Sequence, residues 1–302
     1  MAPKTDYIVV DPDGLCPCRS GKITVVCCMA ADGSFRVKFP PPLPSGDITG
    51  FSHANCYMRD THNCSANAAT GYYFSNGLRE LLRTHVVAVT FPWDEAGKDM
   101  VPGIEDLPAG LLCDRHYAAL APLDAVAIQA FRNILDGVAY VTMKSLATKT
   151  TLAAVSGEGL ELWLLKILFG AYHNALAADG DSPPRNFLPL DTNIFEGALR
   201  SRALAAPRGL YVRRYQTAGE PVHASTNHPK RIAGLYFKIG PLEFELVVDP
   251  DGLDIEAVRN RNFYRPSGID LIGKKRNAQV HMSGLAFATN ETARLALSDM
   301  LG

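Results

Sequence analysis

Four cysteines stand close together near the start of the chain. The segment CPCRSGKITVVCC carries Cys16, Cys18, Cys27 and Cys28 in the spacing C-x-C, eight residues, C-C. Four thiolates in so short a segment suit a tetrahedral zinc ion, because a turn at Gly21 can return the second pair to the first. The metal would also supply folding free energy that so small a module cannot obtain from a core. The alternative is a hairpin whose thiols pack as small apolar groups.

A second group of metal-ligand residues is spread more widely along the chain. Cys56 and Cys64 are separated by seven residues, and Cys113 and His116 follow later as a Cys-x2-His pair. Such a pair is an ordinary zinc half-site, and a loop can close the longer gap of the first pair. The spacing therefore predicts a second zinc ion, so two Zn²⁺ per chain are expected. Packing of Cys113 in the core and of His116 at a helix start remains the alternative.

A basic run near the C-terminus is the third candidate site. Between positions 259 and 276 six cations face one acid, Asp270, and two aromatic residues, Phe263 and Tyr264, are available to stack on bases. This pattern favours binding of nucleic-acid phosphates, although a charge run of this kind also occurs as a solvated face. The six cations are Arg259, Arg261, Arg265, Lys274, Lys275 and Arg276.

Composition limits the classes of protein that could hold these groups. The chain has 302 residues, of which 47% are hydrophobic, so it can bury a sizeable core and is not disordered. Its 30 Lys+Arg nearly balance its 31 Asp+Glu, which excludes a uniformly basic nucleic-acid coat. No secretory signal opens the chain, and Glu161 and Lys166 interrupt its most apolar segment, 160–172. We therefore expect a cytoplasmic protein with reduced thiols and no membrane partner.

Hydrophobic periodicity predicts the elements that must position the candidate sites. Amphipathic patterns indicate helices at 76–84, 123–135 and 194–206, and an apolar segment at 158–178 indicates a central buried helix. Strands are expected at 86–91 and within 209–216, 231–240, 242–248 and 278–289, and a last helix after Asn290 should bury Ala293, Leu297 and Leu301. These elements predict an α+β fold with a helical core and a mostly antiparallel C-terminal sheet. The proline-rich segment 39–46 favours a linker, which gives domains at 1–38, 47–136 and 137–302.

The first cysteine group resembles the SEC-C zinc motif of bacterial proteins. All four cysteines, Pro17 and the Ser20-Gly21-Lys22 turn agree with that motif. The chain departs from it at Arg19, where glycine is usual, and at 23–26, where lysines and an aromatic residue are common. The resemblance implies zinc binding and docking on protein partners, and the missing lysines weaken any attraction to phosphate.

The stretch from Phe51 to Asp124 resembles a zinc-bearing HNH nuclease domain, as found in a bacterial group that carries an N-terminal SEC-C motif. The segment ALAPLD at 119–124 fits this group, as do WLLK at 163–166 and Tyr-Arg-Pro at 264–266. The resemblance implies a zinc domain of the treble-clef type.

In the same alignment, other residues occupy the catalytic positions of such a nuclease. It places Gly71 and Tyr72 where a Glu-His pair belongs and Tyr117 where an asparagine belongs. Tyrosine is a poor general base at neutral pH and a weak magnesium ligand, so we expect no catalytic residue and a degenerate nuclease fold that binds nucleic acid or protein. The alternative is an active metal-dependent endonuclease of a bacterial or phage conflict system, in which His53 or His62 takes the catalytic role.

Overall fold

The chain folds into two compact units, each built from segments that are distant in sequence. The computed structural model describes residues 11–31, 33–85, 87–93, 105, 107–143, 150–177, 188–213, 232–251, 253–287 and 291–297. Unit 1 comprises Met1–Phe39, Gln129–Glu158 and Arg265–Gly302, and unit 2 comprises Pro40–Ile128 and Gly159–Tyr264. The sequence-based ranges 1–38, 47–136 and 137–302 follow chain order, whereas each unit combines pieces of more than one of them. The α+β fold class is confirmed, because both units contain helices and a sheet.

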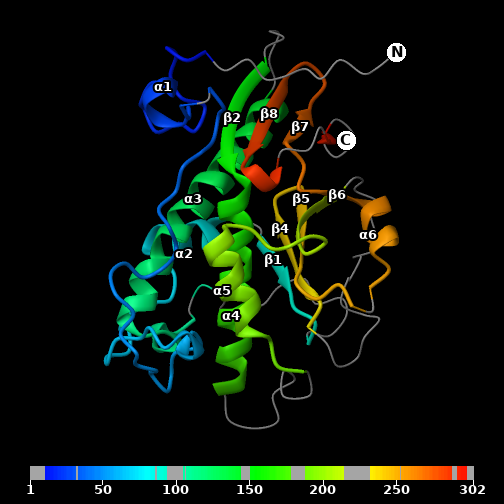
Figure 1. Cartoon of the computed structure of the whole chain (residues 1–302). Coiled ribbons are helices and arrows are strands. Elements are labelled where there is room, and N and C mark those ends of the chain that lie inside the picture. Colours follow the sequence, from blue (N-terminus) through cyan, green and yellow to red (C-terminus); the bar gives the residue numbers. More distant parts are fainter. Residues whose placement is uncertain are drawn as a thin grey trace. The chain divides into compact units, whose positions relative to one another are not determined.

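Unit 1 contains a four-stranded mixed sheet in the order β2-β8-β7-β9 (Figure 1). Strand β8 runs parallel to β2 and antiparallel to β7, and β9 runs parallel to β7. The C-terminal part of helix α3 and the short helices α1 and η5 complete the unit. The bounds are β2 Thr150–Ser156, β7 Gly268–Ile272, β8 Asn277–Ser283, β9 Thr292–Ala296, α1 Thr24–Cys27, α3 Asp114–Thr142 and η5 Leu285–Phe287.

The helix expected after Asn290 is wrong, because Thr292–Ala296 forms strand β9. Ala293, Leu295 and Leu297 are all buried, so burial repeats every second residue, as in a strand. The prediction of a helix was based on Ala293, Leu297 and Leu301, which are four residues apart, and did not consider Leu295. Leu301 lies outside the described residues. Pairing with β7, which lies far away in the sequence, decides this segment.

Unit 2 contains a five-stranded antiparallel sheet in the order β1-β4-β5-β3-β6. The predicted helices at 76–84 and 158–178 and the predicted strand at 86–91 are confirmed within a residue or two, and the helix predicted at 194–206 is shorter and ends at Ser201. The bounds are η1 Arg59–Thr61, α2 Asn76–Thr84, β1 Val87–Thr90, η3 Ala109–Leu111, α4 Gly157–Ala177, α5 Thr192–Ser201, β3 Gly209–Arg213, β4 Gly234–Ile239, β5 Leu242–Val247, α6 Ile255–Arg261 and β6 Asn262–Tyr264.

Helix α4 forms the centre of the core of unit 2, as its almost entirely apolar sequence predicts. Trp163 is 1% exposed and packs edge-on against Phe237 of β4, with ring centroids 5.5 Å apart. Two charged residues in the middle of this helix, Glu161 and Lys166, are also buried. The Glu161 carboxylate accepts hydrogen bonds from the backbone N–H groups of Leu204 and Leu210, at 2.8 and 2.9 Å, so its charge is compensated inside the protein.

Helix α3 is longer than the predicted 123–135 and contains Pro122 in its interior. Among the described residues it is the helix long and apolar enough to cross a bilayer, and 44% of its most apolar stretch is buried inside the protein. Its Asp124 forms an ion pair with Lys166 of α4, at 2.8 Å, and both side chains are almost fully buried. These features are those of a helix that packs in a folded interior.

Candidate metal centres

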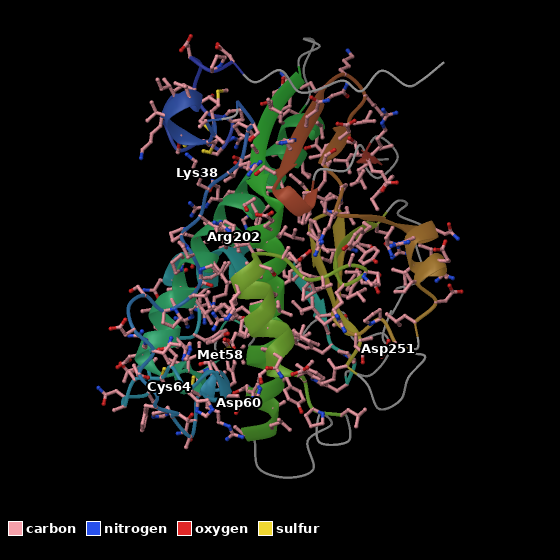
Figure 2. All side chains as sticks on the ribbon, viewed as in Figure 1. Lys38, Met58, Asp60, Cys64, Arg202 and Asp251 are labelled. Atoms are coloured by element: carbon pink, nitrogen blue, oxygen red, sulfur yellow. The ribbon has the colours of Figure 1, made fainter. Side chains whose placement is uncertain are left out.

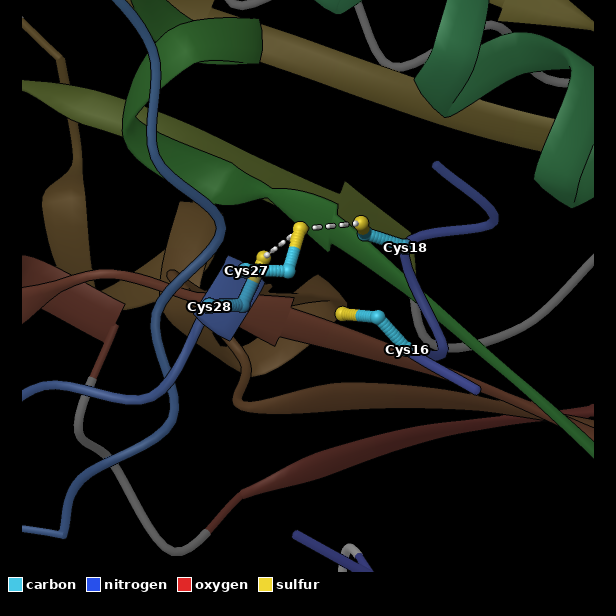
Figure 3. A group of neighbouring side chains, drawn as sticks. All are labelled: Cys16, Cys18, Cys27 and Cys28. Carbon is cyan, nitrogen blue, oxygen red and sulfur yellow. Dashed lines mark hydrogen bonds between the residues drawn. The ribbon is translucent and has the colours of Figure 1, made fainter. Parts of the chain in front are cut away.

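The four cysteines of the first group, here called cluster A, come together in unit 1. The sulfur atoms of Cys16, Cys18, Cys27 and Cys28 all lie within 4.8 Å of one another. The Sγ atoms of Cys18 and Cys28 are each 3.5 Å from that of Cys27, and the side chains converge as Figure 3 shows. Tetrahedral zinc with Zn–S bonds of about 2.3 Å requires sulfurs ~3.8 Å apart, so this donor set fits a zinc ion.

The turn of cluster A requires a left-handed backbone at two positions. Gly21 has φ 78°, as its role in the turn predicts, and Arg19 has φ 62°. Only glycine adopts this region without steric cost, so the left-handed backbone of Arg19 is unfavourable for its side chain. The Arg19 guanidinium forms an ion pair with Asp136 of α3, and this contact offsets part of the cost.

Cluster A packs against the sheet of unit 1. The backbone N–H of Ala154 in β2 donates to the carbonyl of Pro17, at 2.9 Å, and Ala154 shares a buried cluster with Cys16, Cys18 and Cys28. Because β2 is an edge strand, this loop satisfies a backbone group that would otherwise face solvent or another chain. The cysteine loop is therefore an integral part of unit 1.

Burial opposes ionisation of most thiols in cluster A. It raises the pKa of Cys16 to about 11 and that of Cys28 further above its usual range. Burial acts in the same direction on Cys18, but hydrogen bonds from Ser20 and from neighbouring thiols outweigh it and lower the pKa of Cys18 to about 7. Four neighbouring thiolates, three of them buried, would repel one another without a cation, so the set is suited to a divalent cation that compensates their charge.

The second group, here called cluster B, assembles in unit 2 from two distant segments. Cys56, Cys64, Cys113 and His116 place their ligand atoms within 4.8 Å of one another, and each residue is at most 2% exposed. His116 directs Nδ1 at the three sulfurs, at 3.5 Å from Cys56, 3.7 Å from Cys64 and 3.2 Å from Cys113. The donor set of three thiols and one imidazole is a common zinc set, so the residues again fit this metal.

The local environment prepares cluster B for a cation. Burial, followed by the Arg115 charge, lowers the pKa of His116 to about 4, which keeps the imidazole neutral and able to coordinate. Burial raises the pKa values of Cys56 and Cys64. Burial also acts to raise the pKa of Cys113, but backbone N–H groups of His116 and Ser65 outweigh it and lower that pKa. All seven cysteines of the chain thus belong to the two clusters.

The residues at the expected nuclease positions do lie together. The Tyr117 hydroxyl donates to the backbone carbonyl of Tyr72, at 2.7 Å, and the Arg79 guanidinium lies 3.4 Å from the centre of the Tyr72 ring. Burial raises the pKa of Tyr117, which makes its phenolate still less accessible at neutral pH. The alternative candidates are engaged locally: His53 Nδ1 accepts from the N–H of Asn55, and His62 Nδ1 lies 2.8 Å from the Ser52 hydroxyl.

The six cations of the basic run are divided between the two units. Arg259 and Arg261 belong to unit 2, and the other four belong to unit 1. Arg265 is only 5% exposed, with its guanidinium 6.0 Å from the Phe287 ring centre, and Arg276 lies 4.7 Å from the Tyr140 ring centre. Lys274 and Lys275 are exposed between β7 and β8.

The Tyr264 ring of the same run is also engaged inside unit 2. It packs on Tyr211, with ring centroids 4.9 Å apart, and its hydroxyl donates to the Arg208 carbonyl. It is therefore not the free stacking surface that the sequence favoured.

Comparison of the chain with protein-family models, with curated proteins and with solved structures found no match. The metal centres are therefore defined by the chemistry and geometry of their own residues. The sequence predicted all eight residues that come together in the two clusters, but not Thr61, whose hydroxyl lies 3.2 Å from His116 Nε2. Its signal was the unusually long gap between Cys56 and Cys64, which contains it.

Proposed function

We propose that this chain is an intracellular zinc protein whose two ions hold its fold, and that it binds another protein. The observation that carries the proposal is the number of protein ligands in each cluster. Catalytic zinc sites keep three protein ligands and leave a position for water, whereas structural sites are closed by four. Both clusters offer four ligands, which favours a structural role.

The exposed surface beside cluster A supports the choice of a protein partner. Four exposed apolar residues precede the two cysteine pairs in the sequence, and they are here called the apolar rim: Leu15, Ile23, Val25 and Val26. Leu15 is 77% and Val26 68% exposed. Apolar side chains grouped on a surface mark contacts with proteins more often than contacts with phosphates. The division of the basic residues between two units gives nucleic acid less support. The likeness to the SEC-C motif, whose relatives dock on proteins, points the same way.

The segments that form cluster B resemble an HNH nuclease domain, but they lack the catalytic residues of such a domain. The closed ligand set around cluster B and the paired tyrosines, Tyr72 and Tyr117, favour a domain that keeps its zinc and has lost hydrolysis. Magnesium-dependent DNA cleavage by the purified chain that is lost in His53→Ala or His62→Ala would overturn this proposal.

The first experiment counts zinc per chain in protein purified without added metal. The proposal requires two ions. A count of one would mean that only one of the two clusters binds zinc. The single variants Cys28→Ser and Cys113→Ser would then identify which cluster it is. A count of zero would mean that all seven cysteines only pack as small apolar side chains, and it would overturn the proposal.

The second experiment tests the apolar rim as a docking surface. A photo-cross-linking residue at position 26 should capture one protein in cells, and the purified pair should keep its affinity as salt rises, because apolar contacts are not screened. Val26→Asp should lower that affinity at least tenfold while the zinc count stays at two. Ile48→Asp is the matched control, because Ile48 is also 68% exposed but lies in unit 2. Equal affinities of the two variants would refute the docking surface.

A further inference from the structure

The long gap between Cys56 and Cys64 brings a hydroxyl group to the ring of His116. The segment turns through the 3-10 helix η1, Arg59–Thr61, after which His62 adopts a left-handed backbone with φ 51°. Figure 2 labels Met58, Asp60 and Cys64 along this segment. A shorter link could join the two cysteines, so the added residues call for a separate explanation.

The hydrogen bonds of Thr61 determine which way its hydroxyl can act. Thr61 Oγ1 lies 2.7 Å from the carbonyl of Met58 and 3.2 Å from His116 Nε2. A carbonyl only accepts, so the single hydroxyl proton of Thr61 is donated to Met58. Toward His116 the oxygen can then only accept, which requires the proton of the neutral imidazole to sit on Nε2.

This arrangement leaves Nδ1 of His116 with a free lone pair. Nδ1 is the ring nitrogen that faces the sulfurs of Cys56, Cys64 and Cys113, at 3.2 to 3.7 Å. We infer that the Thr61 hydroxyl is a positioning group of cluster B: it holds His116 in the tautomer and orientation that present Nδ1 to the metal. Partners of this kind behind a metal-bound histidine typically change metal affinity by about 10- to 100-fold. The inference rests on the proposed zinc role of cluster B.

The experiment compares variants of the full chain in Zn²⁺ competition against a chromophoric chelator, with Co²⁺ absorption as a readout of the ligand set. Thr61→Val keeps the shape but removes the hydroxyl, and it should weaken cluster B about 10- to 100-fold. Thr61→Ser keeps the hydroxyl and should restore the affinity. Cluster A in the same molecule is the internal reference and should not change.

Thr192→Val provides the matched control. The Thr192 hydroxyl donates to Asp60 of the same segment, at 3.1 Å, so its removal loosens this segment without taking away the hydroxyl beside His116. Its removal should leave both metal affinities unchanged. A loss equal to that of Thr61→Val would show that general loosening of the loop is responsible, and would overturn the inference.

A second background separates positioning from a structural role. His116→Cys replaces the imidazole by a thiolate that has no tautomer, so Thr61→Val should have no effect there. A persistent loss in this background, or an unchanged affinity of Thr61→Val in the natural one, would refute the inference. If Thr61→Val does not fold alone, recovery of folding in the His116→Cys background supports it, and continued failure refutes it. A wild-type chain that holds no metal in cluster B would instead overturn the proposed function.

Discussion

Clusters A and B hold nearly the same donor chemistry but are assembled in different ways. Cluster A draws all four ligands from the short segment Cys16–Cys28, whereas cluster B joins Cys56 and Cys64 to Cys113 and His116. In cluster A the Cys27 side chain is partly exposed, and in cluster B every ligand is buried. The comparison shows that the cluster assembled from one short segment lies partly at the surface of its unit, whereas the cluster assembled from distant segments is fully buried.

The two clusters also differ in what surrounds them. Cluster A contacts the edge strand β2 of the unit 1 sheet through the Pro17 carbonyl, and Arg19 of the same loop forms an exposed ion pair with Asp136 of helix α3. Near cluster B, buried polar groups continue into the core of unit 2. Tyr57, next to Cys56, shares a 2.5 Å hydrogen bond with Tyr73, whose hydroxyl donates to the Lys166 carbonyl. Loss of cluster B should therefore disturb more of the structure than loss of cluster A.

The largest expected effect comes from removing one ligand from each cluster. Cys113→Ser should lower the free energy of unfolding of unit 2 by more than about 4 kcal/mol, and Cys28→Ser should lower that of unit 1 by about 3 kcal/mol or less. A cross-link between distant segments constrains the unfolded chain more than one within a short loop. Tryptophan fluorescence reports unit 2 selectively, because Trp93 and Trp163 both belong to it. Equal losses in the two variants would contradict the distinction drawn between the clusters.

The next largest difference in stability is expected between variants of two ion pairs, one in each unit. Lys166→Met leaves the buried Asp124 carboxylate without its cation and should cost about 3–5 kcal/mol. Asp136→Asn removes an exposed partner of Arg19 and should cost about 0.2–1 kcal/mol. Denaturant unfolding of both variants measures the difference. The double variant Lys166→Met/Asp124→Asn should recover part of the loss, and no recovery would argue against charge imbalance as its cause.

Acid should weaken unit 2 through a buried histidine. His173 stacks on Tyr57 with ring centroids 5.3 Å apart, and burial, followed by the Arg59 charge and opposed by Asp60, lowers its pKa to about 4. Between about pH 6.5 and 4 the unfolded chain binds this proton and the folded chain does not, so stability is complete above this window and falls as pH decreases. We expect a loss of about 1–3 kcal/mol by pH 4.

Two variants test the assignment of this acid sensitivity to His173. His173→Phe keeps the ring stacking and should reduce the pH dependence of tryptophan-detected unfolding between pH 7 and 4.5. The part that remains is expected from His116, because burial also lowers the pKa of that buried histidine to about 4. His85→Ala removes an exposed histidine and should leave that dependence as it is. An unchanged slope in His173→Phe would assign the acid sensitivity to another group.

Local patterns in the sequence predicted those elements whose conformation is decided locally. Helix α2 has Leu78, Leu81 and Leu82 on one face, and α4 is apolar on almost all sides, so both were predicted within a residue or two. Strand β9 was missed because its apolar residues were assigned the period of a helix, whereas Ala293, Leu295 and Leu297 are buried at every second position. The ligand types and their spacing likewise predicted both metal clusters, since thiols and imidazole at these intervals have few other uses.

The sequence by itself determined the candidate metal-binding residues, the central helix and the turn at Gly21, because each is indicated by residue types and by spacing along the chain. Only the tertiary structure decided that cluster A covers the edge of β2, that Arg265 is buried and that Thr61 meets His116. These features depend on contacts between segments far apart in the chain. Their geometry is set by packing and by the need to satisfy each buried polar group, and neither is encoded in local spacing.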